Sequence, residues 1–333
     1  MANTYMEAVS QMLRRGYFSN SYKFALLRSL SDFGSSPEGG QKISIDKLAN
    51  KFIEYYWPLT LLFKLRQETD PTKPPIVMKE IKQVADALGL SPETKLETFR
   101  KKHPDQLENL IKTIADSSDG AFRDVIPRFH NIRGGGVKAR LFDFDRNNYL
   151  QEGITINPKA RSFLKDNHYT LDLLAIGGWV KFTEKYSSSP RLFEKIQGLK
   201  PDRGALNSYR KFFLSQGVKQ CFYCSCPIGV KPEVDHVIPW SFVADDKVWN
   251  LVLACKKCNG SGGKSNRLPH VEFVMALIQR NDKIMANNPD KLPLKIKTDL
   301  AEWRGQRTEL GKHIEILVGR CEADGFDRWG PSL

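Results

Sequence analysis

The sequence predicts an α+β protein in which a mostly helical N-terminal region precedes a compact strand–loop–strand–helix core flanked by helices. Three observations support this fold class: apolar residues recur at helical spacing over residues 1–115, two Cys-x-x-Cys pairs stand close together further along, and two short apolar strands lie between them. With 333 residues and 41% hydrophobic residues, the chain can build packed domains. We expect a helical domain (1–118), a mixed basic connecting region (119–204) and a domain that carries the core (205–333).

The first part should contain several helices. Residues 22–30 place apolar side chains on one helical face, and a further helix should begin after Ser44, a suitable N-cap, and end near Pro58. More helices are expected over residues 76–88 and 92–116. Two helices joined by a short loop occur in helix-turn-helix readers of DNA and in ordinary helix packing, and both interpretations stay open.

The connecting region is rich in cations. Over residues 120–140 a single acid, Asp124, stands against five basic residues: Arg123, Arg128, Arg133, Lys138 and Arg140. Three consecutive glycines, 134–136, interrupt them, so a flexible loop could follow a phosphate backbone through Arg128, Arg133, Lys138 and Arg140. A solvated linker is the alternative. Residues 139–144 alternate as a short strand, and residues 171–186 predict a helix.

The cysteines predict a structural zinc site. Five of the six cysteines fall within residues 221–258, and four of them form two pairs with the spacing of zinc knuckles: Cys221, Cys224, Cys255 and Cys258. Four thiolates fill a tetrahedral site and leave no open position, so this zinc would be structural. Cys226 is a competing ligand with poorer spacing, and Cys321 stands alone.

The residues between the two cysteine pairs predict more than a binding module. Residues 233–239 alternate as a strand that contains Asp235 and His236, and residues 250–255 form a second strand that opens with Asn250. The residues after Cys255 can begin a helix, which would bring Asn259 near its end. The expected order is therefore strand, loop, strand and helix.

Charge and the lack of apolar runs limit the partners. The 51 Lys and Arg residues exceed the 38 Asp and Glu residues by 13, which favours a polyanionic partner such as nucleic acid, although a basic protein without such a partner has the same composition. No apolar run approaches the roughly 18 residues of a membrane span, and the first residues carry no secretory signal. We therefore expect a cytoplasmic protein with no membrane partner.

At these residues the chain resembles the HNH endonuclease family, whose core is the ββα-metal fold. The resemblance covers about residues 218–269. It rests on the two cysteine pairs, the Asp-His-Val-Ile-Pro segment from Asp235, the Asn-Leu-Val-Leu-Ala-Cys segment from Asn250, and Asn259 directly after Cys258. It implies a helical N-terminal region joined to an HNH nuclease domain of the H-N-N variant.

The resemblance also implies roles for the residues of the core. Asp235 and Asn259 would bind a catalytic divalent ion, Mg²⁺ or Mn²⁺, His236 would be the general base, and Asn250 would order the loop that holds the base. A glycine-rich segment follows Asn259. Within and after it, Lys264 and Arg267 are candidate contacts to the phosphate backbone, with solvated cations as the alternative.

The implied function is a metal-dependent endonuclease, a hydrolase that nicks or cuts DNA, with double-stranded DNA as the expected partner. Two alternatives stay open: an RNase toxin, and a non-catalytic zinc module that binds nucleic acid or protein. In size and domain order the chain is similar to nucleases of bacterial anti-phage systems such as the Zorya type, which implies antiviral defence and protein partners from the same system.

Overall fold

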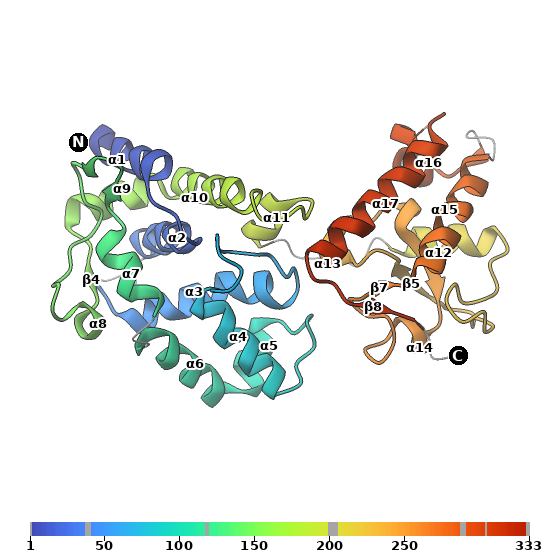
Figure 1. Ribbon diagram of the computed structural model, residues 1–333, viewed down its shortest axis with the longest axis horizontal. Coiled ribbons are helices and arrows are strands. Elements are labelled where there is room, and N and C mark those ends of the chain that lie inside the picture. The colour runs from blue at the N-terminus through green and yellow to red at the C-terminus, as the bar shows by residue number, and fades with distance from the viewer. Residues whose placement is uncertain are drawn as a thin grey trace. The chain divides into compact units, whose positions relative to one another are not determined.

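The chain folds into two compact units, seen here in a computed structural model that describes residues 2–36, 41–116, 120–198, 206–286, 291–303 and 305–330. One unit comprises Met1–Ser187 with Leu192–Gly198, and the other comprises Ser188–Arg191 with Leu199–Leu333. Figure 1 shows that helices dominate the first unit and that the second combines short strands with helices. The predicted α+β class is confirmed. Both predicted domain boundaries, 118/119 and 204/205, fall on residues outside the described ones.

The first unit is built from helices and two small strand pairs. Its helices are α1 (Ala2–Arg15), α2 (Tyr22–Ser35), α3 (Ile45–Leu61), α4 (Ile76–Ala87), α5 (Leu96–Lys102), α6 (Pro104–Asp116), α7 (Ala121–Arg128), α8 (Tyr149–Glu152), α9 (Pro158–Asp166), α10 (His168–Thr183) and α11 (Leu192–Gln197). Its strands are β1 (Lys42–Ile43), which pairs antiparallel with β4 (Ile154–Thr155), and β2 (Asn131–Ile132), which pairs antiparallel with β3 (Gly135–Gly136).

Helix α2 lies at the centre of this unit and packs against α3, α7, α9 and α10. Most of its residues are buried, including the polar Arg28, Ser29 and Ser31, because neighbouring helices surround it. The core around it contains large aromatic side chains that lose all exposure to solvent, among them Phe52, Tyr56, Phe122 and Trp179. Such a core would bury enough apolar area to fold as a unit. Among the helices that the structure describes, none is long and apolar enough to cross a membrane.

Helix α3 begins as predicted and ends later than predicted. The Ser44 side chain accepts a hydrogen bond from the Lys47 amide, which is the expected N-cap. Pro58 lies inside the helix, which continues to Leu61. The last turn holds because Trp57 and Leu59 are buried on either side of the proline and the Leu62 amide donates to the Pro58 carbonyl. Tertiary packing therefore outweighs the missing proline N–H group.

Two other sequence predictions need correction. The expected helix over residues 92–116 is divided into α5 and α6 at His103, because the residue before Pro104 is disfavoured in helical geometry. The expected strand over residues 139–144 is a bend with one bridge, Asp143 to Thr155. Leu141 and Phe142 are both fully buried, and consecutive burial does not fit the alternation of a strand.

The second unit is smaller and centres on a two-stranded ribbon. Its helices are α12 (Leu206–Ser215), α13 (Trp240–Val243), α14 (Lys256–Asn259), α15 (Val271–Ala286), α16 (Leu294–Asp299) and α17 (Arg307–Ala323), with 3₁₀ helices η2 (Val248–Asn250) and η4 (Ala301–Trp303). Its strands are β5 (Glu233–His236), β6 (Leu251–Ala254), β7 (Leu268–Pro269) and β8 (Arg328–Trp329).

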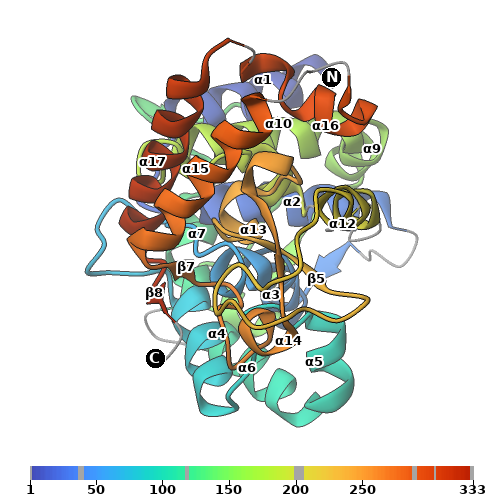
Figure 2. The same ribbon diagram turned by 90° about the vertical axis from the view of Figure 1, so that its right-hand side faces the viewer.

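Strands β5 and β6 pair antiparallel, with Asp235 opposite Val252 and His236 opposite Leu251. Helix α12 packs on both strands, α14 packs on β5, and α15 lies beside α17 (Figure 1 and Figure 2). Strands β7 and β8 pair parallel, which joins the segment after α14 to the segment after α17. The predicted strand–loop–strand–helix order is therefore present as β5, β6 and α14, with helices on its flanks.

Candidate functional site

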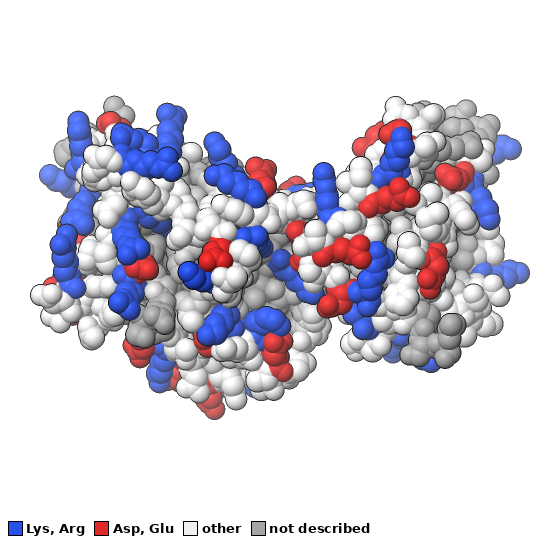
Figure 3. Space-filling view, in the orientation of Figure 1, with Lys and Arg blue, Asp and Glu red and all other residues white. Residues whose placement is uncertain are grey.

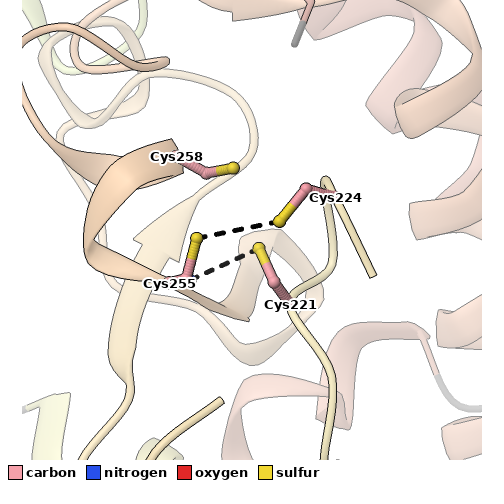
Figure 4. A group of neighbouring side chains, drawn as sticks. All are labelled: Cys221, Cys224, Cys255 and Cys258. Atoms are coloured by element: carbon pink, nitrogen blue, oxygen red, sulfur yellow. Dashed lines mark hydrogen bonds between the residues drawn. The ribbon is translucent and has the colours of Figure 1, made fainter. Parts of the chain in front are cut away.

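Four cysteine sulfurs from two distant segments converge in the second unit. Cys221 and Cys224 lie in the turn after α12, and Cys255 and Cys258 lie at the start and inside α14 (Figure 4). All four Sγ atoms lie within 4.8 Å of one another, and the Cys224 and Cys255 sulfurs are 3.8 Å apart. A tetrahedral zinc ion with Zn–S bonds of about 2.3 Å separates its sulfurs by about 3.8 Å. The four thiols can therefore hold a tetrahedral metal ion.

Hydrogen bonds hold the two cysteine-containing turns together. The Cys255 amide donates to the Cys221 sulfur, and the Phe222 amide donates to the Leu253 carbonyl of β6, so both knuckles are tied together. Burial by itself would raise the pKa of Cys255. Hydrogen bonds from the Cys258 amide and the neighbouring thiols together outweigh burial, so the pKa is lowered to about 7. Cys226, the possible competitor, is exposed and lies outside the converging group.

Strand β5 carries Asp235 into a buried polar environment. The side chain is 6% exposed, and its Oδ2 atom accepts a hydrogen bond from the Tyr223 hydroxyl at 2.6 Å. The same oxygen lies 3.4 Å from the Lys264 ammonium. Burial, together with the charge of Asp235, raises the pKa of Tyr223 well above its ordinary value, so this tyrosine stays a donor.

Lys264 occupies a position that differs from the predicted one. It was expected to contact the phosphate backbone, but it is fully buried and its ammonium faces Asp235. The chain reaches this position because Gly263 folds back on α14: a Cβ atom there would clash with the Cys258 carbonyl oxygen. Burial lowers the pKa of Lys264, while the Asp235 charge opposes that shift. Lys264 is therefore a partner of Asp235 in this structure.

His236 follows Asp235 and has a different partner. Its Nε2 atom lies 2.7 Å from the Asp246 Oδ1 atom. Asp246 precedes η2, and its backbone carbonyl accepts a hydrogen bond from the Tyr209 hydroxyl, which fixes the loop on α12. A carboxylate only accepts, so we assign the Nε2 proton to the neutral imidazole and leave the lone pair on Nδ1. Asp246 was not anticipated from the sequence, because ten residues separate it from His236.

Asn250 closes the loop between β5 and β6. Its Nδ2 atom donates to the Ile238 carbonyl at 2.9 Å, and its Oδ1 atom accepts from the Ile238 amide at 2.8 Å. A third bond runs from the Val237 amide to the Asn250 carbonyl. Because Asn250 is 1% exposed, these bonds form without competition from water. The Asn250 side chain therefore uses both its nitrogen and its oxygen to hold the backbone of Ile238, two residues after His236.

Asn259 ends α14 and faces β5. Its Nδ2 atom donates to the Glu233 Oε2 atom at 2.7 Å. Glu233 and Asp235 are two residues apart on one strand, so their side chains leave the same face. Carboxylate and amide oxygens such as these are ligands that a hard divalent cation accepts. Glu233 was not anticipated from the sequence, although its spacing of two residues from Asp235 could have pointed to it.

The remaining candidate contacts fall into two groups. The Arg267 guanidinium donates to the carbonyls of Gly263 and Lys264, which braces the turn after α14. Arg128, Arg133, Lys138 and Arg140 belong to the first unit, and all four are exposed.

A family model described as HNH endonuclease matches residues 221–270, which span both cysteine pairs, β5, β6, α14 and Lys264. Comparisons with curated proteins and with solved structures gave no match.

Proposed function

We propose that the protein is a metal-dependent endonuclease that hydrolyses phosphodiester bonds of DNA, because residues 221–270 match the HNH endonuclease family. The observation that carries the proposal is the pair of His236 and Asp246, in which His236 directly follows Asp235 in sequence. A carboxylate that fixes the tautomer and orientation of a histidine supports its use as a general base. A zinc module used only for binding has no need of such a pair.

His236 would take the proton from the attacking water. With the Nε2 proton held by Asp246, the Nδ1 lone pair is the basic site of the neutral ring, and the water proton moves to that atom. Asp246 then faces an imidazolium and stabilises its charge. Asn250 keeps the segment after His236 in place through its two bonds to Ile238.

Asp235 and Asn259 would hold the catalytic ion, because carboxylate and amide oxygens suit a hard divalent cation. Both contacts of Asp235 among the described residues use Oδ2, and Asn259 spends its amide nitrogen on Glu233, so each residue keeps an oxygen for a ligand bond. A bound Mg²⁺ or Mn²⁺ would neutralise charge on the phosphate and stabilise the leaving oxygen. The four cysteines would hold a structural zinc.

Double-stranded DNA is the proposed substrate, in line with the excess of 13 positive charges. A role in anti-phage defence with protein partners, and a cytoplasmic location, stay predictions that rest on size, domain order and sequence composition.

The test is a cleavage assay with purified full-length protein. Supercoiled plasmid, single-stranded DNA and RNA are each incubated with Mg²⁺, with Mn²⁺ and with EDTA. We expect plasmid nicking or cutting that EDTA abolishes and that His236→Ala reduces by about 10²- to 10⁴-fold. His270→Ala is the matched control, because His270 is an exposed histidine of the same unit. Cleavage of RNA alone would replace the DNA assignment, and near-normal cleavage by His236→Ala would refute the catalytic one.

A further inference from the structure

The first unit carries a surface on which two segments without acidic residues meet. Residues 8–31 and residues 125–142 contain no Asp or Glu. They are far apart in sequence, yet the structure joins them: Gly16 bridges Ile132, the Arg133 amide donates to the Arg15 carbonyl at 2.8 Å, and the Arg15 guanidinium donates to the Arg133 carbonyl at 2.6 Å. The end of α1 therefore lies against the β2–β3 hairpin.

This junction gathers cations from four elements into what we call the basic face. Its members come from the end of α1, the start of α2, the end of α7 and the hairpin with its continuation: Arg14, Arg15, Lys23, Arg128, Arg133, Lys138 and Arg140. Six of them are exposed, and Lys23 is half-buried. Figure 3 shows Lys and Arg side chains predominating over the end of the unit that carries α1.

Internal ion pairs do not account for the basic face. Within the described part of the chain, the pair of Arg128 with Asp124 is the one that joins a member of the face to an acid. Neighbouring cations contribute, after burial, to the low pKa values of two residues. Burial and the Arg128 charge lower the pKa of Lys23 to about 8. Burial and the charges of Arg140 and Lys23 lower the pKa of His130, beneath the face, to about 3.

The shape and the aromatic content of the face suit a phosphate backbone. Tyr17 is 61% exposed and its ring lies 5.8 Å from the Arg133 guanidinium. A tyrosine hydroxyl beside arginines can donate a hydrogen bond to a phosphate oxygen of the duplex backbone. The hairpin turns at Gly134, whose φ of +90° favours glycine, and Gly135 and Gly136 are exposed without side chains, so a phosphate can approach the backbone closely.

We infer that the basic face is a second nucleic-acid-binding site, separate from the candidate active site, that engages the phosphate backbone of duplex DNA. Uncompensated cations bind a duplex favourably because they displace the counterions condensed on its phosphates, and they hold the duplex without reading its sequence. The choice of nucleic acid among polyanions rests on the proposed function of the second unit.

The test measures binding without cleavage, in EDTA, by fluorescence anisotropy of a labelled duplex of about 20 base pairs over a range of salt concentrations near 100 mM. One variant neutralises the hairpin side (Arg133→Gln, Lys138→Gln and Arg140→Gln). A second neutralises the helix side (Arg14→Gln and Arg15→Gln). A matched control neutralises two exposed lysines of α5 in the same unit (Lys101→Gln and Lys102→Gln).

We expect both face variants to weaken binding by about fivefold or more, while the control changes little. The slope of log affinity against log salt should fall by about 0.9 for each phosphate that the variant no longer neutralises. If only the hairpin variant weakens binding, residues 133–140 act as a basic loop and the composite face is wrong. If the control weakens DNA binding equally, the loss of affinity follows from net charge alone, and the proposal is wrong. Capture by anionic phospholipid vesicles in place of DNA would also overturn it.

Thermal melting checks that each variant is folded. Arg15 also donates a hydrogen bond to the hairpin, so the helix-side variant could lower the melting temperature. In that case Arg14→Gln alone replaces it. Plasmid cleavage is measured separately. DNA binding through the face without any cleavage would refute the nuclease and leave the face intact, whereas cleavage with unchanged binding in both variants would refute the face alone.

Discussion

The candidate site of the second unit and the basic face of the first unit hold their polar and charged side chains in opposite ways. In the second unit, Asp235, His236, Asn250 and Lys264 are all buried, and each has a specific partner within hydrogen-bonding or ion-pair distance. In the first unit, most cations of the basic face are exposed and one has an acidic partner among the described residues. A buried group depends on its specific partner, so a single substitution there should have a large effect. Exposed charges contribute little individually, so several must be changed together. The following predictions test this contrast in order of expected size.

The largest effect should come from disruption of the cysteine cluster. Cys224→Ser or Cys255→Ser should release one zinc ion per chain and unfold the second unit, because metal binding in small structural sites contributes about 10 kcal/mol or more. Metal analysis and hydrogen exchange by mass spectrometry measure the two outcomes, and α2 of the first unit should stay protected.

Cys226→Ser is the matched control for this change, because Cys226 is exposed and outside the converging group. A protein that holds no zinc and is as stable as its Cys224→Ser variant would rule the zinc site out.

Removal of the Lys264 ammonium should be the next largest effect. Lys264→Met keeps the stem of the side chain but leaves the buried Asp235 carboxylate without its cation, which should cost about 3 kcal/mol of unfolding free energy in buffer without Mg²⁺. If Asp235 also binds the catalytic ion, Mg²⁺ should restore part of this stability. Denaturant titrations with and without Mg²⁺ give both values. Lys257→Met, at an exposed lysine of α14, is the control. Equal stability of the two variants would mean that the ion pair contributes nothing.

A smaller effect is expected when the partner of the histidine changes. Asp246→Asn preserves size but can present an amide donor to Nε2, which favours the tautomer with its proton on Nδ1. Cleavage should fall by about 10- to 100-fold while DNA binding and zinc content stay constant. Asp245→Asn is the neighbouring control. Should both variants cleave equally well, Asp246 does not orient His236.

The smallest effect concerns His130 of the first unit. Its pKa is about 3 when folded against an ordinary value of 6.5, because it is buried and near Arg140 and Lys23. Between these two values the unfolded chain binds the proton and the folded chain does not. The stability is therefore complete above pH 6.5 and is lost as the pH falls. At pH 5 the decrease should be about 2 kcal/mol.

Hydrogen exchange at α7 measures this decrease between pH 7 and pH 5. His130→Gln is the comparison variant, because its amide oxygen can accept the Leu141 amide bond and does not titrate. If both proteins are destabilised equally at pH 5, His130 is not the source of the pH dependence.

The sequence alone determined the features that depend on local spacing. Periodic apolar residues predicted α2, α4 and α10, Ser44 predicted the start of α3, alternation predicted β5, and an apolar run beside the second cysteine pair predicted β6. The Cys-x-x-Cys spacing predicted the converging sulfurs, and the order of Asp235, His236, Asn250 and Asn259 led to the family that the family model also matches. These signals succeed because each one lies within a few residues or in a fixed motif.

Only the tertiary structure decided which distant groups meet. The partners Asp246 for His236 and Tyr223 for Asp235, the burial of Lys264, and the hydrogen bonds between Arg15 and Arg133 all join residues whose separation carries no periodic signal. Pro58 stayed inside a helix and residues 139–144 did not form a strand, because burial of neighbouring side chains outweighed local preference. Packing free energy depends on the whole unit, so no local pattern could have revealed these outcomes.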